Sequence, residues 1–227
     1  MLRHHNMPKI YLYLPLPLML AFAFGCQHVS GDEAEFVPLF NGKDFEGWIG
    51  ATDQYRVEDD VIVLPKGRGG KLLTAKQYDN FVLRFEFKLT AGANNGLAIR
   101  APVKGDAAYN AIELQILDNS SARWPDLKPY QTHGSIYGVV PAKRGFLKPV
   151  GEWNRQEVIC DGRQIRVILN GHPILDADLD RVAPEGHTLD GQPHPGLSNT
   201  RGHLGFLGHG DQVAFRNIRI RSLDPKQ

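Results

Sequence analysis

The chain has 227 residues, of which 42% are hydrophobic and 22% charged, a composition typical of a globular domain and unlike that of collagen, a disordered tail or a polytopic membrane protein. Its 26 Lys and Arg residues against 25 Asp and Glu residues give a formal charge of +1. Such a balance provides no bulk electrostatic field to recruit nucleic acid or an anionic membrane surface. We therefore expect no nucleic-acid partner and a neutral or small ligand.

Residues 1–25 have the order of a secretory signal peptide, in which a basic stretch precedes an uncharged apolar run at residues 10–25. The 16 residues of this run fall short of the roughly 20 that a membrane-spanning helix needs, so a retained anchor helix is the less favoured alternative. The residues around Cys26 resemble a bacterial lipobox, which implies a lipid on Cys26 and export to the periplasmic or cell-surface side of a bacterial membrane. Residues 26–35 would then be a polar tether, and the membrane a partner only through the lipid.

From residue 36 to residue 224 we expect one domain built of β-strands, because apolar and polar residues alternate with a period of two, most clearly at residues 82–89. Asp161-Gly162 predicts a hairpin turn whose two central residues have positive φ. Residues 74–81 could hold one helical turn, and residues 183–202 are expected to form a long loop. Further short strands are expected at residues 96–100, 111–117, 135–140, 155–160, 164–171, 203–208 and 212–223.

Eight or more short antiparallel strands predict an all-β fold, a two-sheet sandwich of the jelly-roll type or a close variant. On the strand at residues 111–117, Ile112, Leu114 and Ile116 are expected to face the core. Glu113 and Gln115 then lie side by side on the opposite face, roughly 6.5 to 7 Å apart along the strand. They could line a groove together, although a polar face of this kind is more often simply solvated.

Several blocks of the sequence resemble the bacterial 3-keto-disaccharide hydrolase family, and they occur in the order of that family. The resemblance implies a two-sheet, concanavalin A-like jelly roll that acts on glycosides already oxidised at C3 of the sugar. The blocks that carry it are FVPLFNGKDFEGW at residues 36–48, NNGLAIR at 94–100, IELQILDN at 112–119, the segment 134–154, GHLGFLGHG at 202–210 and VAFRNIRI at 213–220.

A ketone at C3 acidifies the C2 hydrogen, so a base can remove that proton, the enediolate can expel the C1 substituent, and water can then add to the glycal. This route needs a base near C2, an electrophilic group at the enolate oxygen and an acid at the leaving oxygen. The resemblance assigns Glu113 as base or acid, Arg100 as anion stabiliser and His209 as the second proton-transfer group. The residues expected to bind the sugar are Gln115, Asn95, Trp124 and Tyr137.

No cofactor is firmly expected, and a single divalent cation held by Glu113, Asp118 and water is the one candidate. The alternative function is that of a non-catalytic, lectin-like carbohydrate-binding module on the same sandwich. Leu207-Gly208 favours this alternative, because the family usually has Gln-Asp before the final His. Arg100 could equally be a salt-bridged edge residue, and His209 a structural loop residue. The sequence leaves the oligomeric state open.

Overall fold

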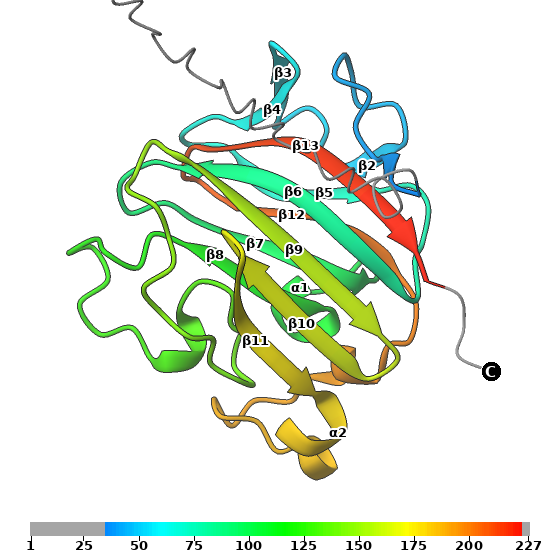
Figure 1. Ribbon diagram of the computed structural model, residues 1–227, viewed down its shortest axis with the longest axis vertical. Helices are drawn as coiled ribbons and strands as arrows, with labels where there is room; N and C mark the ends of the chain where they lie inside the picture. Colours follow the sequence, from blue (N-terminus) through cyan, green and yellow to red (C-terminus); the bar gives the residue numbers. More distant parts are fainter. Residues whose placement is uncertain (1–34, 224–227) are drawn as a thin grey trace, which may run out of the picture. The chain divides into compact units, whose positions relative to one another are not determined.

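Two antiparallel sheets pack face to face in a computed structural model, which describes residues 35–223 (Figure 1). The all-β, jelly-roll fold expected from the sequence is confirmed. The larger sheet has the strand order β11 (His172–Asp178), β10 (Gln164–Leu169), β9 (Trp153–Asp161), β6 (Phe81–Leu89), β13 (Val213–Ser222), β4 (Val61–Leu64) and β3 (Arg56–Glu58), with β1 (Val37–Pro38) paired to β13. The smaller sheet has the order β2 (Trp48–Gly50), β5 (Gly69–Thr74), β12 (His203–His209), β7 (Asn94–Ala101) and β8 (Ile112–Leu117).

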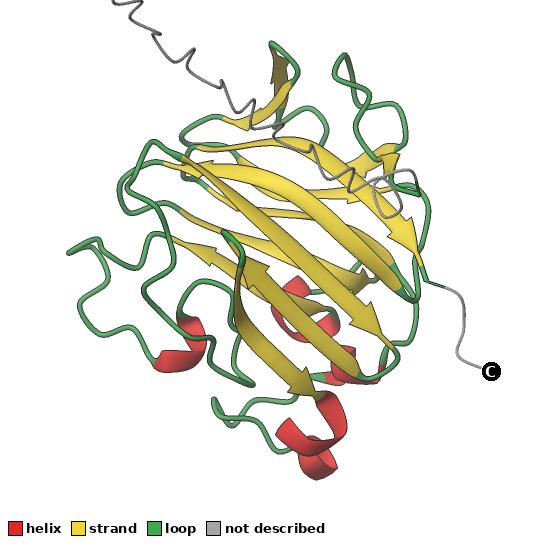
Figure 2. Ribbon diagram, viewed as in Figure 1, coloured by secondary structure: helices red, strands yellow, loops and turns green. Residues whose placement is uncertain are grey.

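The helices of the described residues are single turns within loops (Figure 2). The α-helices are α1 (Ala107–Asn110) and α2 (Leu179–Val182), and the 3-10 turns are Pro129–Gln131, Pro184–Gly186 and Pro195–Ser198. The helical turn considered at residues 74–81 does not form: Thr74 ends β5, residues 75–80 are a loop, and Phe81 begins β6. No helix among residues 35–223 is both long and apolar enough to cross a membrane.

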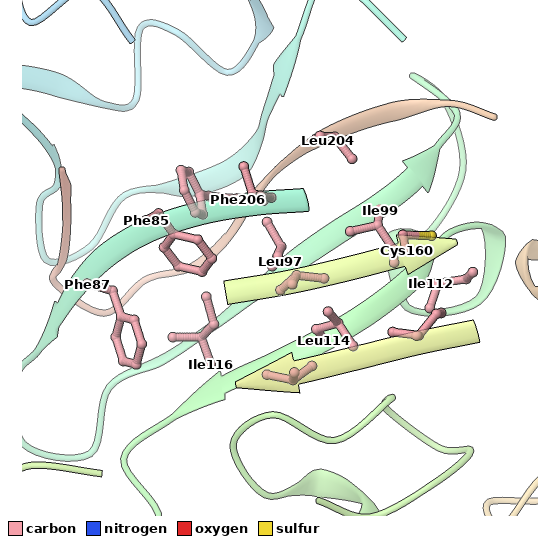
Figure 3. Close-up of a cluster of buried hydrophobic side chains, with 14 of the residues drawn as sticks. Phe85, Phe87, Leu97, Ile99, Ile112, Leu114, Ile116, Cys160, Leu204 and Phe206 are labelled. Carbon is pink, nitrogen blue, oxygen red and sulfur yellow. The ribbon is translucent and has the colours of Figure 1, made fainter. Parts of the chain in front are cut away.

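The inward faces of the two sheets form one apolar core, to which the long central strands contribute alternate residues. All the residues that strand alternation assigned to the core on β6 and β8 are buried there. Figure 3 shows Phe85 and Phe87 of β6 lying near Leu97, Ile116 and Phe206 of the smaller sheet. The ring of Phe206 packs edge-on against Phe85 with centroids 5.7 Å apart. The expected period of β6 and β8 is therefore confirmed.

The strand expected at residues 135–140 does not form, and residues 134–140 instead cover the free edge of β8 with irregular hydrogen bonds. The Tyr137 amide donates to the Glu113 carbonyl and the Gln115 amide to the Ser135 carbonyl, both at 3.0 Å. Gly138, with φ of 74°, turns the chain away, so no regular ladder forms. This covering segment closes one side of the surface that Glu113 and Gln115 share.

The hairpin between β9 and β10 is present, but its turn differs from the expected one. Asp161 pairs with Gln164, so the two central residues are Gly162 and Arg163. Only Gly162 has a positive φ, of 59°, which matches a turn with glycine at its first central position.

The strands β1 to β5 and β11 lie in segments for which the sequence predicted no strand, since they are short or interrupted by glycine, proline and charged residues. The expected signal peptide, the lipid on Cys26 and most of the tether lie outside the described residues and stay predictions.

Candidate active site

Glu113 extends from β8 onto the outer face of the smaller sheet, opposite the core. Its neighbours along the strand, Ile112 and Leu114, face inward, so alternation directs Glu113 outward. The carboxyl lies over Gly96 of the adjacent strand β7, where a Cβ atom would collide with it. Glycine at this position therefore provides the room that the carboxyl occupies.

An apolar surface surrounds this carboxyl even though it lies outside the main core. The side chains that form a second cluster on this face are Leu73, Ala98, Ala101, Ala107, Ala111 and Leu207. Glu113 is 5% exposed, and no hydrogen bond from residues 35–223 reaches its carboxyl oxygens. Burial, reinforced by the nearby negative charge of Asp106, raises the pKa of Glu113 to about 8. The group is therefore mostly a neutral acid at pH 7.

A cavity of about 250 Å³, which we call the Glu113 cavity, opens beside this group and also contains His209, Lys71 and Asp106 in its walls. Lys71 of β5 donates hydrogen bonds to the carbonyls of Val103 and Gly105, at 2.7 and 2.8 Å. An ammonium has three N–H groups, so one is left for a ligand. Asp106 caps α1 by accepting a hydrogen bond from the Ala108 amide at 3.0 Å, and α1 packs against β7 and β8 (Figure 1).

His209, at the end of β12, supplies an imidazole to the same cavity. The residue as a whole is exposed, yet enclosure of the ring lowers its pKa below the usual value, against the opposing attraction of Asp106 and Asp211. The ring is therefore neutral at pH 7 and has a nitrogen able to accept a proton. Glu113 and His209 thus have pKa values shifted in the directions that a paired acid and base require.

Gln115, two residues farther along β8, lines a second cavity of about 350 Å³, which we call the Trp124 cavity. Trp124 and Tyr137, both expected to bind sugar, lie in its walls. Gln115 donates a hydrogen bond to the Asn94 side chain at 3.0 Å. The structure therefore brings Gln115, Trp124 and Tyr137, three of the four residues expected to bind sugar, together in one cavity.

Asn95 does not lie on this surface, and Asn94 takes its place. Asn95 pairs with Ile116, whose side chain faces the core, so Asn95 also points inward and is fully buried. Its side-chain oxygen accepts a hydrogen bond from the Gly96 amide at 2.9 Å. Counting alternate residues back from the core residue Leu97 would have assigned Asn95 to the interior. The expected sugar-binding role of Asn95 is therefore wrong.

Arg100 is also absent from both cavities. Its φ of 52° and a register shift between β7 and β12 mark a bulge, which breaks the alternation that would have placed Arg100 beside Glu113. The side chain is 1% exposed, and its guanidinium donates to the carbonyls of Gly162, Asp79 and Asn199 at 2.8, 3.1 and 3.2 Å. Arg100 thus joins loops at one end of the sandwich, and Lys71 is the cation of the Glu113 cavity.

Asp118 has a structural role in the loop after β8. Its two oxygens accept hydrogen bonds from the amide of Gly92 at 2.8 Å and from the amide and hydroxyl of Ser120 at 3.0 and 2.6 Å. Burial opposes ionisation, but these hydrogen bonds hold the pKa of Asp118 below its usual value. Asp118 follows Glu113 by five residues of extended chain, roughly 16 Å, and lines a different cavity, so the two carboxyls that were expected to share a cation do not lie in one site.

A family profile described as the 3-keto-alpha-glucoside-1,2-lyase-like domain matches residues 35–221, which includes both cavities and every strand but the last residue of β13. The chain belongs to this family. A 3-keto-disaccharide hydrolase of Bacteroides thetaiotaomicron is 28% identical over an alignment that covers 85% of this chain and 80% of that protein.

Solved structures of a candidate glycosyl hydrolase and of a carbohydrate-binding module share this fold. A candidate glycosyl hydrolase of Parabacteroides distasonis is 34% identical, with a TM-score of 0.74 over 83% of this chain and 99% of that one. A carbohydrate-binding module of Bacillus subtilis has a TM-score of 0.53 at 12% identity over 82% of this chain and 100% of that one. The second likeness concerns the fold alone.

The sequence alone did not predict that Lys71 and Asp106 line the Glu113 cavity. Lys71 lies in GGKLLT, where two glycines obscure the strand period, and Asp106 lies in a turn whose position relative to β8 depends on the fold. Pairing of β5 with β12 places Lys71 opposite Leu207, two residues from His209. Such a cross-strand relation needs the register of the sheet, which one sequence does not contain.

Substituting Glu113→Gln should make the protein more stable at alkaline pH. Because the folded-state pKa of about 8 lies above the ordinary 4.5, the folded protein holds a proton that the unfolded chain loses between these values, and wild-type stability falls as pH rises through that window. Glutamine does not titrate, so the free energy of unfolding of the variant should exceed that of wild type by about 2 to 4 kcal/mol at pH 9 and converge with it near pH 4.

Urea unfolding at both pH values measures this difference, with Glu46→Gln, an exposed glutamate, as the matched control. The control should track wild type at every pH. A Glu113→Gln variant that is no more stable than wild type at pH 9 would mean that the carboxyl is hydrated or paired in solution.

Proposed function

We propose that this protein is an enzyme that cleaves the glycosidic bond of 3-keto-glucosides or 3-keto-disaccharides. The observation that carries the proposal is Glu113, a buried carboxyl with a raised pKa, facing a cavity that also contains a neutral imidazole. Membership of the 3-keto-alpha-glucoside-1,2-lyase-like family and similarity to a named 3-keto-disaccharide hydrolase support the same substrate class.

The proposed reaction begins with removal of the C2 proton by the neutral His209 ring. The electrons of the C2–H bond form an enediolate with the C3 ketone, and the ammonium of Lys71 offsets the negative charge on its oxygen, the role first assigned to Arg100. The enediolate then collapses to a C1–C2 double bond and expels the C1 oxygen, which takes its proton from Glu113. At this point His209 is protonated, because it holds the proton from C2, and Glu113 is an ionised carboxylate.

Water completes the reaction by adding across the C1–C2 double bond. Glu113, now a carboxylate, accepts a proton from the water as its oxygen bonds to C1, and His209 returns a proton to C2. Both groups recover their starting states, and the products are a 3-keto sugar and the free alcohol. No oxocarbenium ion is formed, so the pair of carboxylates that ordinary glycosidases require is not needed.

A lectin-like carbohydrate-binding module is the second candidate function. Leu207-Gly208 before His209 favours it, as do the Trp124 cavity, with an aromatic ring and amide groups, and the shared fold of a carbohydrate-binding module. A binding module has no use for an unpaired buried acid, however, because the desolvated group lowers stability and forms no hydrogen bond with residues 35–223. The enzyme is therefore the function that the site supports best.

The purified protein should release product from 3-keto-trehalose and leave unoxidised trehalose intact, because only the ketone activates the C2 hydrogen. In Glu113→Gln the shape is kept and the transferable proton is lost, so turnover should fall about 10² to 10⁴-fold while substrate still binds. Chromatography of released glucose measures cleavage of the two sugars by the wild-type protein and the loss of turnover in the variant. Cleavage of plain trehalose, or full activity in the variant, contradicts the assignment, and binding of both sugars without turnover would indicate the module.

The pH dependence of kcat/KM distinguishes the two roles that Glu113 could have. If Glu113 is the acid, activity should fall as pH rises through about 8, because the carboxyl ionises. Activity should also fall well below pH 6.5, where His209, with its lowered pKa, takes up a proton. A rate that instead rises through pH 8 would make ionised Glu113 the base and reverse the assignment.

A further inference from the structure

The helix α1 forms one wall of the Glu113 cavity but is too short to hold its position alone. Ala107 and Ala111, at its two ends, belong to the apolar cluster around Glu113, and Asp106, its N-cap, lies in the cavity wall. A helix of four residues has no stability of its own and forms only where other parts of the chain support it. The environment of Glu113 therefore depends on the contacts that fix α1.

The loop at residues 187–199 supports α1 near its C-terminal end. The Asn199 side chain donates a hydrogen bond to the Asn110 carbonyl at 2.9 Å. The imidazole of His194 packs edge-on against the ring of Tyr109, with centroids 4.9 Å apart. This loop therefore holds α1 both at the backbone and at its aromatic side chain.

Asp190 fixes the orientation of His194 within the loop. The imidazole Nε2 lies 3.0 and 3.1 Å from the two carboxylate oxygens, and the His194 side chain is only 2% exposed. Burial opposes the ionisation of Asp190, but hydrogen bonds from neighbouring groups, the His194 ring among them, hold its pKa below the usual value. The acceptor is therefore a carboxylate, and Nε2 bears the proton. A buried, charge-assisted hydrogen bond of this kind keeps the ring in one orientation.

The same pair is attached to the segment 134–140, which covers the edge of β8. The Asp190 amide donates a hydrogen bond to the Gly138 carbonyl at 3.1 Å, and a Cβ atom at Gly138 would collide with both side chains of the pair. The preceding residue, Tyr137, donates its amide hydrogen to the Glu113 carbonyl. A continuous series of contacts thus runs from the backbone of Glu113 through the pair to α1.

We propose that His194, oriented by Asp190, is a positioning residue that keeps α1 in place beside Glu113. The inference rests on the proposed function, in which Glu113 must enter the reaction as a neutral acid. His194 lines neither the Glu113 cavity nor the Trp124 cavity, so its effect passes through the ring of Tyr109 to α1. Loss of this contact would let α1 move away and admit water to the carboxyl.

Hydration and charge would change the pKa of Glu113 in opposite directions. Water that enters when α1 moves away removes the desolvation, and the greater distance from Asp106 weakens a repulsion, so both changes lower the pKa toward 4.5. An unpaired Asp190 carboxylate, left behind in His194→Ala, would instead raise it. The other titratable groups around this carboxyl are Tyr109 of α1, Lys71 of β5, His209 of β12 and Tyr137 of the covering segment.

The pH profile of kcat/KM on 3-keto-trehalose tests the inference. His194→Ala should move the alkaline limb down by about one pH unit from about 8, so that activity falls about fivefold at pH 8 and changes less than about twofold at pH 6. His187→Ala is the matched control, because His187 is an exposed histidine of the same loop whose ring bonds to the Pro184 carbonyl. A limb that stays in place, or moves to higher pH, would overturn the inference and leave the proposed function standing.

Variants of Tyr109 show whether the effect passes through α1. Tyr109→Phe keeps a ring against His194 and should retain the wild-type limb, whereas Tyr109→Ala should move the limb as far as His194→Ala does. The double variant should move it no farther, because both substitutions break one contact. Shifts that add in the double variant, or a wild-type limb in Tyr109→Ala, would overturn the inference.

A titration of Glu113 itself separates failure of the positioning pair from failure of the proposed function. Carbon-13 NMR of protein labelled at the glutamate carboxyls, with the signal assigned by its loss in Glu113→Gln, should show a midpoint about one pH unit lower in His194→Ala than in wild type and His187→Ala. If 3-keto-trehalose is not cleaved, the proposed function is wrong, but this shift should still occur. Equal midpoints would overturn the inference, and Tyr109→Ala gives the same reading if His194→Ala does not fold.

Discussion

The alternation of strand β8 is the constraint on which both the core and the site depend. Three of its residues fill the interior between the sheets, and this fixes the direction of the two between them, Glu113 and Gln115. A shift of one residue in its register would reverse both faces, bury two polar groups in the core and expose three apolar ones. The selection for a stable core and for a working site therefore acts on the same register.

Burial of Glu113 has opposite effects on stability and on chemistry. The apolar cluster around it excludes water, which makes the ionised form unfavourable. A sequence selected only for stability would replace the glutamate or pair it with a cation. The glutamate instead lies over a glycine and beside a cavity, and no side chain in the described part of the chain gives it a hydrogen bond. Such a cost is typical of groups that must hold a proton at neutral pH.

Strand alternation, counted along one chain, predicted the layers, the core and the shared surface of Glu113 and Gln115. It failed where the backbone departs from regular geometry or where two strands must be aligned. The bulge at Arg100 turns inward a side chain that the family resemblance had assigned to the site of Glu113. Lys71 is brought to the cavity by the register of β5 on β12, a long-range property that a local pattern does not contain. The resemblance to a family supplied His209, which lies at a strand end, and Trp124 was expected to bind sugar as an aromatic residue in a loop; neither position has a period of its own.

Cleavage carried out in deuterated water tests the central claim most directly, namely that loss of the C2 proton precedes departure of the C1 oxygen. His209 takes the C2 proton and later returns one, and an imidazolium N–H exchanges with water while the leaving group departs. If water adds to a glycal, the carbon C2 of the released 3-keto sugar therefore receives its hydrogen from the solvent. Nuclear magnetic resonance of the product, taken at early times beside an enzyme-free sample of the same keto sugar, should show one deuterium at C2 per cleavage, in excess of the slow exchange of the control. A product that retains its original hydrogen at C2 would contradict the elimination mechanism.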